Sequence, residues 1–411
     1  MRATGWGDEG ARPCRGSRPE RRFARVAAHP HRVEIARYLL GRGLDPDTGK
    51  VPTERLQQTA RAARSLKLDF PDGLAPTSVD LPARSRSDPL PAADVVVVTW
   101  TVDELAGLAK VLAPTTSAAK WWTTYASNYD QLATQISPSA PARKSGRLGS
   151  YQLIKVGKLT VLLLKSELHL NQDRILQSPG MATLPVKDLF LQVIAEAQPA
   201  CVITAGTAGS VFDQFPLGDV VVTRAAKFRL QQEFKNEPYN NAHYESHWQI
   251  PTTHLDAAEQ LMQRFADELR MPPIGMPTVG YPDTALAAAP VLTPRIRLEQ
   301  GGRDMPEFHP ILTTDYFEYG TTLNRLDTQG AAVEMGDAAL GLACSELADP
   351  PNWLVVRNMS DPVINGNLPA KEFPLNEQTT WAVGFYSAYG EWTSACGALA
   401  VWAVIAGLAA A

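Results

Sequence analysis

A run of four valines, Val95 to Val98, limits the possible folds of this chain more than any other feature of its sequence. Asp94 precedes the run, and Thr99 and Trp100 follow it. β-branched residues favour strands, and a strand without polar alternation has both of its faces covered. The chain therefore requires a sheet with helices on both sides, which is the arrangement of α/β proteins.

Predicted helices and strands alternate along the rest of the chain. A hairpin is predicted around Gly157-Lys158, where two apolar runs meet at a turn. Because this hairpin interrupts the alternation, we predict a three-layer α/β/α domain with a mixed central sheet. Helices are predicted over 101–112, 185–199, 254–270 and from about 377 onward, and strands over 94–100, 151–166, 200–210, 217–228 and 353–362.

Composition indicates a soluble globular protein of one large or two smaller domains, with 411 residues, 45% hydrophobic and 20% charged. The net charge of −4 argues against a nucleic-acid or membrane partner. The four cysteines lie far apart without a C-x-x-C pair, so a zinc site or redox dithiol is not expected. Cys201, Cys344 and Cys396 lie in apolar runs and are predicted core residues, which favours a reducing, cytoplasmic location.

The two ends of the chain differ from its middle. Residues 1–40 hold nine arginines and four acids without the apolar core of a signal peptide. They form either a nucleic-acid or membrane arm or, as we prefer, a disordered tail or an over-extended start. We divide the chain into a basic, partly disordered extension with its linker, residues 1–92, and one domain, residues 93–411. Residues 395–411 carry no charge; a buried final helix is favoured over a tail anchor.

Several short motifs follow one another in an order more specific than any of them alone. Gly206 to Gly209, within "ITAGTAGS", reads as a strand running into a turn whose backbone amides could hold an anion or a sugar oxygen. No G-x-G-x-x-G or G-K-[ST] motif is present there. In order come "TWTVDEL", "VLLLKS", "ITAGTAGS", "LTTDYFEYG", "VEMGDAA" and "VVRNMSDP". From about Asp94 to its C-terminus, the chain resembles the nucleoside phosphorylase and nucleosidase superfamily, nearer its methylthioadenosine/adenosylhomocysteine nucleosidase branch.

This resemblance implies a nucleoside-phosphorylase-like fold and cleavage of an N-glycosidic bond through an oxocarbenium-like transition state. It implies that Asp361 protonates the departing base and that Glu104 activates water. It also implies that Phe317 stacks on the base, beside Glu318, whose backbone reads the base edge. The further substrate-binding residues that we predict are Glu334, Met335 beneath the sugar, Thr207, Ser166, Gly206 and Ser360.

Each of these residues also has an ordinary structural interpretation. Asp361 would then be a helix N-cap or turn residue, and Glu104 a solvated acid on a helix face. Phe317 would be a core residue, and Thr207 and Ser166 would be turn residues.

Two departures from the family pattern bear on the substrate. The family has Glu-Met-Glu, with the second glutamate gripping the ribose hydroxyls, where this chain has Glu334-Met335-Gly336. Asp337 lies one residue later, about 100° around a helix, and need not face the pocket. Phosphorolytic relatives carry arginines where this chain has Thr204 and "TWTVDE", which favours hydrolysis over phosphorolysis.

The sequence thus predicts hydrolysis of a purine-type N-glycoside by a homo-oligomer, most simply a dimer, with no cofactor and no metal. The alternatives are phosphorolysis, a lyase or cyclase for an apolar or cationic-intermediate substrate, and a ligand-binding protein without turnover. Residues 225–248 are either a mobile loop over the pocket or an exposed connection. Glu167, His169 and Asp173 match no dense metal-binding motif.

Overall fold

The computed structural model describes residues 68–113, 122–170, 174–175, 178–215, 217–247, 252–264, 296–297, 310–368, 370–371 and 376–410. Residues 1–67, which include the arginine-rich segment and Cys14, lie outside the described residues, as does Asp173.

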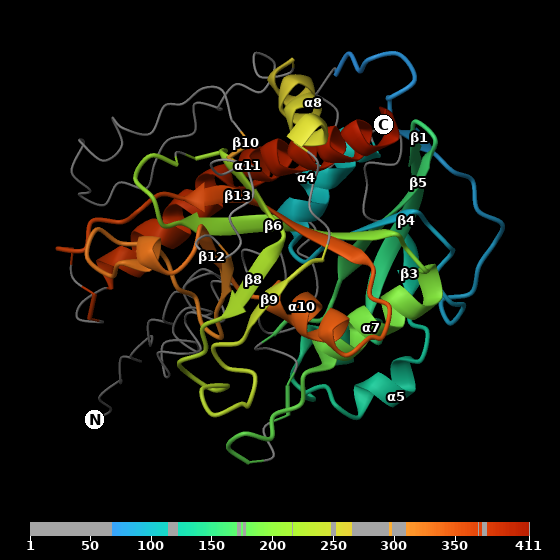
Figure 1. Ribbon diagram of the computed structural model, residues 1–411. Helices are drawn as coiled ribbons and strands as arrows, with labels where there is room; N and C mark the ends of the chain where they lie inside the picture. The colour runs from blue at the N-terminus through green and yellow to red at the C-terminus, as the bar shows by residue number, and fades with distance from the viewer. Residues whose placement is uncertain are drawn as a thin grey trace, which may run out of the picture.

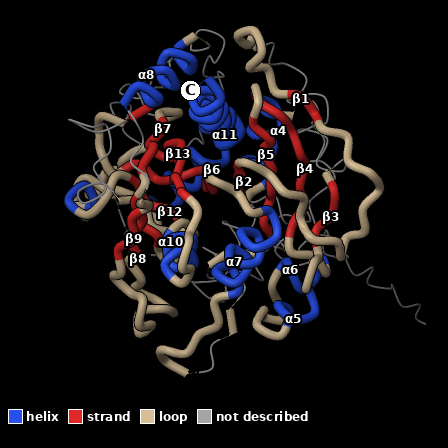
Figure 2. Tube along the Cα trace, turned by 45° about the vertical axis from the view of Figure 1, so that its right-hand side comes forward, coloured by secondary structure: helices blue, strands red, loops and turns tan. Residues whose placement is uncertain are grey.

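A central sheet lies between two layers of helices (Figures 1 and 2). Helices α4 (Val102–Leu112), α8 (Thr252–Gln263) and α11 (Glu377–Ala410) pack together on one face. Helices α7 (Pro185–Ala197) and α10 (Ala338–Ser345) pack together on the opposite face. The predicted three-layer α/β/α fold is confirmed.

The sheet is mixed, and the described residues contribute thirteen strands to it. Its main order is β1-β4-β5-β2-β6-β12-β11-β8-β9, with β13 paired to β6 and β7. The strands are β1 (Thr77–Ser78), β2 (Val95–Thr99), β3 (Thr123–Tyr125), β4 (Gly149–Val156), β5 (Leu159–Ser166), β6 (Cys201–Ser210), β7 (Val220–Thr223), β8 (Ala225–Phe228), β9 (His243–Glu245), β10 (Ile296–Arg297), β11 (Ile311–Thr313), β12 (Ala332–Glu334) and β13 (Asn352–Asp361).

The four valines of β2 show why both faces of the sheet are covered. Val95 and Val97 belong to the apolar core beneath α4 and α11, whereas Val96 and Val98 belong to the core beneath α7 and α10. Successive side chains of a strand point to opposite faces, so the unbroken apolar run serves two cores. β2 and β13 run parallel to β6 on either side of it, and their carboxyl ends therefore reach the same edge of the sheet.

The uncharged C-terminal segment forms the last turns of α11. Gly390–Ala410 has the length and composition of a membrane span, and 83% of its most apolar stretch is buried inside the protein. The helix contacts α4, α8, β6 and β13, and Cys396 lies in the same core. The expected buried final helix is confirmed, and Cys201, Cys344 and Cys396 are buried as predicted.

Two local predictions were wrong. Gly206 to Gly209 do not form a turn after the strand, because β6 continues through them to Ser210, paired along much of this length with β13. The strand expected over 217–228 is two strands, β7 and β8, separated at Arg224. In both cases the pairing partners, rather than local propensity, determine where the strand ends.

The described part of the predicted extension lies against the domain. β1 pairs antiparallel with β4. The Phe70 ring packs on Trp402, whose indole N–H donates to the Leu74 carbonyl at 2.9 Å. Residues 68–92 thus contribute to the fold through the outer edge of the sheet and through α11.

Candidate active site

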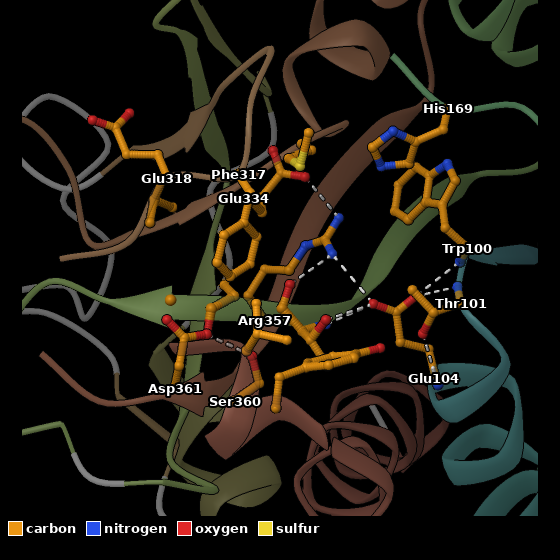
Figure 3. Close-up of a pocket in the computed structure, with 17 residues that line it drawn as sticks. Trp100, Thr101, Glu104, His169, Phe317, Glu318, Glu334, Arg357, Ser360 and Asp361 are labelled. Atoms are coloured by element: carbon orange, nitrogen blue, oxygen red, sulfur yellow. Dashed lines mark hydrogen bonds and ion pairs between the residues drawn. The ribbon is translucent and has the colours of Figure 1, made fainter. Parts of the chain in front are cut away.

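A cavity lies at the shared carboxyl edge of β2, β6 and β13 (Figure 3). It encloses about 690 Å³, its opening to solvent included. Side chains from distant parts of the sequence form its wall: Trp100, Thr101, Glu104, His169, Thr207, Ala208, Gly209, Phe317, Glu318, Val333, Glu334, Met335, Arg357, Ser360, Asp361, Val383 and Tyr386.

Glu104 is fixed by the way α4 begins. Thr101 is the N-cap, and its hydroxyl accepts from the Glu104 N–H while the Glu104 side chain accepts from the Thr101 N–H, which is a capping box. Glu104 Oε2 accepts from the Thr101 N–H at 2.7 Å, the Trp100 N–H at 2.9 Å and the Thr99 hydroxyl at 2.9 Å. The solvated surface acid considered from the sequence is thus replaced by a buried, oriented carboxylate.

The other oxygen of Glu104 is held by β6. Oε1 accepts from the Thr207 N–H at 2.8 Å and the Thr207 hydroxyl at 3.0 Å. The amide and hydroxyl expected to receive an external anion are therefore engaged by a carboxylate of the protein itself. Burial acts to raise the pKa of Glu104, but the Arg357 guanidinium and the surrounding N–H groups outweigh burial and lower it. Glu104 is consequently an anion at neutral pH.

Arg357 is the centre of the charge cluster. Its Nε and Nη2 donate to the two oxygens of Asp337 at 2.8 and 2.5 Å, and Nη2 also donates to Glu334 Oε2 at 3.1 Å. Nη1 lies 3.9 Å from Glu104 Oε1, and the guanidinium stacks 4.9 Å from the centre of the Trp100 ring. Three buried carboxylates thus share one buried cation.

Burial, together with the excess of acidic groups over the single arginine, raises the pKa of Glu334. Burial and the neighbouring Asp337 raise the pKa of Glu334 to about 8, against the opposing effects of Arg357 and the Thr313 hydroxyl. Asp337 accepts both arms of Arg357 and is fully buried, and it is not part of the cavity wall. This agrees with the expectation that Asp337 need not face the pocket.

Asp361 lies at the opposite end of the cluster from Glu104 (Figure 3). Its Oδ1 accepts from the Ser360 hydroxyl at 3.0 Å, whereas Oδ2 has no hydrogen-bond partner within the described structure. Burial raises the pKa of Asp361 to about 7, and the Ser360 hydroxyl only partly offsets this effect. A register shift in β13 between Met359 and Asp361 brings both Ser360 and Asp361 to the cavity wall.

Phe317 and Glu318 form a further part of the wall. The Phe317 ring is partly exposed and packs 5.8 Å from the Tyr319 ring. Glu318 pairs with Arg229 at 2.6 Å, and its carboxylate is turned away from Arg357 (Figure 3). Burial raises the pKa of Glu318 in spite of the pairing with Arg229.

The surface beside Gly336 is aromatic. A Cβ atom placed on Gly336 would lie 3.2 Å from Cζ2 of Trp100. The indole is therefore in tight contact with the place of a side chain at position 336 and would have to shift by a few tenths of an ångström to admit one. Trp100 is itself packed edge-on against Phe190 and His169, with ring centres 6.3 and 6.4 Å away.

Eight of the ten predicted site residues line this cavity, and Ser166 and Gly206 do not. The Ser166 hydroxyl is part of a local turn, in which it donates to the Leu168 carbonyl at 2.9 Å and accepts from the Leu168 N–H. Gly206 lies behind Glu104 and Arg357, since a Cβ there would come within 2.5 Å of an atom of each side chain. The eight are Glu104, Thr207, Phe317, Glu318, Glu334, Met335, Ser360 and Asp361.

Five residues of the cavity wall are not among the ten predicted site residues: Arg357, Trp100, His169, Val383 and Tyr386. Arg357 is a charged residue inside the predicted buried strand 353–362. Because a buried charge must be paired, the sequence could have predicted that Arg357 contacts acidic residues. Nothing local marks Val383 and Tyr386, which reach the cavity from the beginning of α11.

Two further segments were considered from the sequence. The described part of 225–248 supplies no residue to the cavity wall. Glu167 is buried and pairs with Lys165 at 2.6 Å and with Arg147 at 2.6 Å, and among the described residues no group of three potential ligands could hold a metal.

The comparisons with known proteins agree with this architecture. The family model of the phosphorylase superfamily matches residues 128–380. The chain belongs to the phosphorylase superfamily. The predicted family and the prediction that the chain is an enzyme are thereby confirmed. The match includes every predicted site residue except Glu104, which lies before it.

Solved structures similar to this phosphorylase-superfamily chain are distant in sequence. A 5'-methylthioadenosine/S-adenosylhomocysteine nucleosidase from Neisseria meningitidis is 14% identical, with a TM-score of 0.41, over 76% of this chain and 99% of that one. An S-adenosylhomocysteine nucleosidase from Streptococcus pyogenes is 12% identical, with a TM-score of 0.40, over 78% and 98%. The futalosine hydrolase of Helicobacter pylori is 10% identical, with a TM-score of 0.39, over 76% and 96%. A comparison with curated proteins finds no match.

Proposed function

We propose that this enzyme hydrolyses the N-glycosidic bond of a purine-type nucleoside or a related N-glycoside. The observation that carries the proposal is Asp361, a buried acid with a pKa of about 7 and an unpartnered oxygen in the wall of the cavity. A carboxyl group with this pKa is protonated in part at neutral pH and can give its proton to a departing base. Such an acid suits a leaving group that departs as a nitrogen anion.

Glu104 is the proposed partner of Asp361 in this reaction. As an anion beside Arg357, Glu104 would orient a water molecule toward the anomeric carbon and stabilise positive charge on the sugar ring. The carbon–nitrogen bond breaks as Asp361 protonates the base. The water then forms the new carbon–oxygen bond and loses a proton to Glu104. The lowered pKa of Glu104 makes it a weak base before attack, and the proton moves once the bound water has become acidic.

The charges around the cavity support water rather than phosphate as the nucleophile. Arg357 lines the cavity, but its Nε and Nη2 already donate to Asp337 and Glu334, and its Nη1 donates to the Thr207 carbonyl at 3.2 Å. Arg224 bonds to the Ser246 carbonyl and Glu245 and does not line the cavity. Arg357 is the one arginine or lysine among the described lining residues, and the ionised Glu104 beside it would repel a phosphate dianion.

The proposed base site is the partly exposed face of Phe317. An aromatic ring in the wall gives stacking energy to any planar base. Glu318 lies next to it with its side chain engaged by Arg229, which leaves the backbone of this segment as the proposed partner for the base edge.

The aromatic surface at Gly336 supports a second, narrower candidate. Trp100 lines the cavity and packs tightly beside Gly336, which has no side chain, so the wall at Trp100 offers an apolar face and no added carboxylate. A substrate with an apolar or deoxygenated group in this region, including a non-nucleoside, would suit it better than one with a free diol.

Incubation of the full-length protein with purine nucleosides, their 2'-deoxy analogues and 5'-thio analogues tests the proposal. Chromatography should detect free base from at least one compound without added phosphate, and phosphate should not raise the rate. If no base is released, or if the Asp361→Asn variant releases base at the same rate, the proposal is wrong.

A further inference from the structure

A second, smaller cavity lies behind Glu104, on the side facing α11. Its lining residues are Thr99, Glu104, Leu108, Ala205, Gly206, Asn358, Ser394, Gly397 and Ala398. All of them are buried. The Glu104 side chain borders both this cavity and the larger one, so it forms part of the partition between them.

Two polar groups in this cavity lack a protein partner. Asn358 Nδ2 and Ser394 Oγ have no hydrogen-bond partner within the described residues, although the side chains are only 1% and 3% exposed. A buried donor left unpaired costs free energy, and such groups in native proteins commonly mark an internal water. Both residues line the same small cavity, so one water molecule there could serve both groups.

The positions of these groups follow from the packing. Asn358 comes directly after Arg357 on β13, so the two side chains lie on opposite faces of the sheet. Gly397 of α11 makes room for the Asn358 carboxamide, because a Cβ there would lie 2.4 Å from Asn358 Oδ1. Gly107 of α4 allows α11 to approach closely at Ser394 in the same way.

Thr99 connects the small cavity to Glu104. Thr99 lines the cavity, and its hydroxyl donates to Glu104 Oε2 at 2.9 Å. The Thr99 hydroxyl oxygen can still accept a hydrogen bond through its lone pairs. Oε2 of Glu104, the oxygen that Thr99 contacts, already accepts from three donors, in Thr99, Trp100 and Thr101. A molecule in the cavity would therefore reach Glu104 through Thr99.

We propose that this cavity binds one ordered internal water molecule, held by Asn358 Nδ2 and Ser394 Oγ. The water donates a hydrogen bond to the Thr99 hydroxyl, and the Thr99 hydroxyl in turn donates to Glu104 Oε2, so the water helps to fix the position of Glu104. The cavity is large enough for one water and supplies the two to four polar partners that a buried water needs. Asn358 and Ser394 are then positioning residues for Glu104, and this role rests on the proposed function of Glu104.

A crystal structure of the full-length protein at about 1.2 Å resolution or better tests the water directly. We expect a peak of density within hydrogen-bond distance of both Asn358 Nδ2 and Ser394 Oγ. A cavity without density at that resolution overturns the proposal.

The melting temperature of the Ser394→Ala variant is a second test. If a water is bound, the variant removes one of its partners and melts at a lower temperature than the wild type. If the cavity is dry, the variant removes an unsatisfied hydroxyl and melts at the same or a higher temperature; this result contradicts the proposal. Neither test requires turnover, so both remain decisive if no base is released.

The pH dependence of kcat/KM distinguishes positioning from a purely structural role. In the Asn358→Leu variant, which fills the cavity and removes its donor, we expect the acid limb to move up by about half a pH unit, because the ionised form of Glu104 loses support. We also expect kcat to fall several-fold with little change in KM. The matched control is Thr393→Val, since the Thr393 hydroxyl bonds to the Gly390 carbonyl of its own helix and lines neither cavity. An unchanged acid limb in Asn358→Leu contradicts the positioning role.

Discussion

The two ends of the cavity hold carboxyl groups in opposite surroundings. Glu104 accepts five hydrogen bonds and lies beside a guanidinium. Asp361 accepts one from Ser360 and has an unpartnered oxygen. Burial acts on both side chains in the same direction, yet the pKa of Glu104 is lowered and that of Asp361 is raised to about 7. The Arg357 charge and the supply of donors, rather than the depth of burial, therefore decide which group is the anion and which is the acid.

The largest expected effect is that of Asp361→Asn. An amide of nearly the same shape cannot deliver a proton, so we expect kcat to fall about 10²–10⁴-fold with the fold intact. Steady-state rates of base release and circular dichroism check this. Asp349→Asn, at an exposed position after α10, is the control for an Asp→Asn change outside the cavity. Its kcat should equal that of the wild type. Equal rates for Asp361→Asn and the wild type would exclude Asp361 as the acid.

The next effect in size is that of Glu104→Gln. The amide nitrogen would face hydrogen-bond donors, and the negative charge beside Arg357 would be lost. We expect a fall in kcat of about 10²-fold and a lower melting temperature. Asp103→Asn is the matched control, because Asp103 lies in the same helical turn and outside the cavity wall; its activity should stay within about twofold of the wild type. A Glu104→Gln variant as active as this control would remove Glu104 from the mechanism.

The pH profile of the wild type should reflect the same contrast. Asp361 must be protonated to act, so kcat/KM should fall about tenfold per pH unit above a pH of about 7. Glu104 must be ionised, and its lowered pKa places the acid limb below the ordinary value of 4.5. Rates measured across the pH range with a fixed substrate check both limbs. A rate that stays constant to pH 9 would contradict the role of Asp361.

The last expected effect is on stability. The pKa of Asp361 rises on folding from 3.8 to about 7, so the folded state binds more protons than the unfolded state between these values. Its contribution is fully present below the unfolded pKa and is lost as pH rises through about 7, by at most about 1.4 kcal/mol per pH unit. Urea unfolding of the wild type and Asp361→Asn at several pH values would show this slope in the wild type alone. Identical slopes would mean that Asp361 titrates normally.

The sequence predicted the layers of this fold because its strands and helices carry periodic apolar patterns. The valine run of β2 and the apolar C-terminal segment of α11 were interpreted correctly for that reason. The continuation of β6 through Gly206 was missed, because pairing with β13 overrides the turn preference of glycine.

Within the site, the sequence motifs predicted many of the residues that line the cavity, but not the hydrogen bonds and charges around them, which depend on three-dimensional packing. Eight predicted residues line one cavity, but no pattern in "RNMSDP" indicates that Arg357 lies among three carboxylates or that Asp361 lacks a second donor. The close packing of the Trp100 ring beside Gly336 could not be predicted either, because the two residues are far apart along the chain.

The central claim is that Asp361 and Glu104 hold opposite protonation states in one cavity at neutral pH. A carboxyl-carbon NMR titration of the full-length protein, with resonances assigned from Asp361→Asn and Glu104→Gln, measures this directly. We predict that Asp361 titrates near pH 7 and that Glu104 remains ionised down to below pH 4.5. An Asp361 resonance that titrates near pH 4, or a Glu104 resonance that titrates near neutrality, would contradict the account.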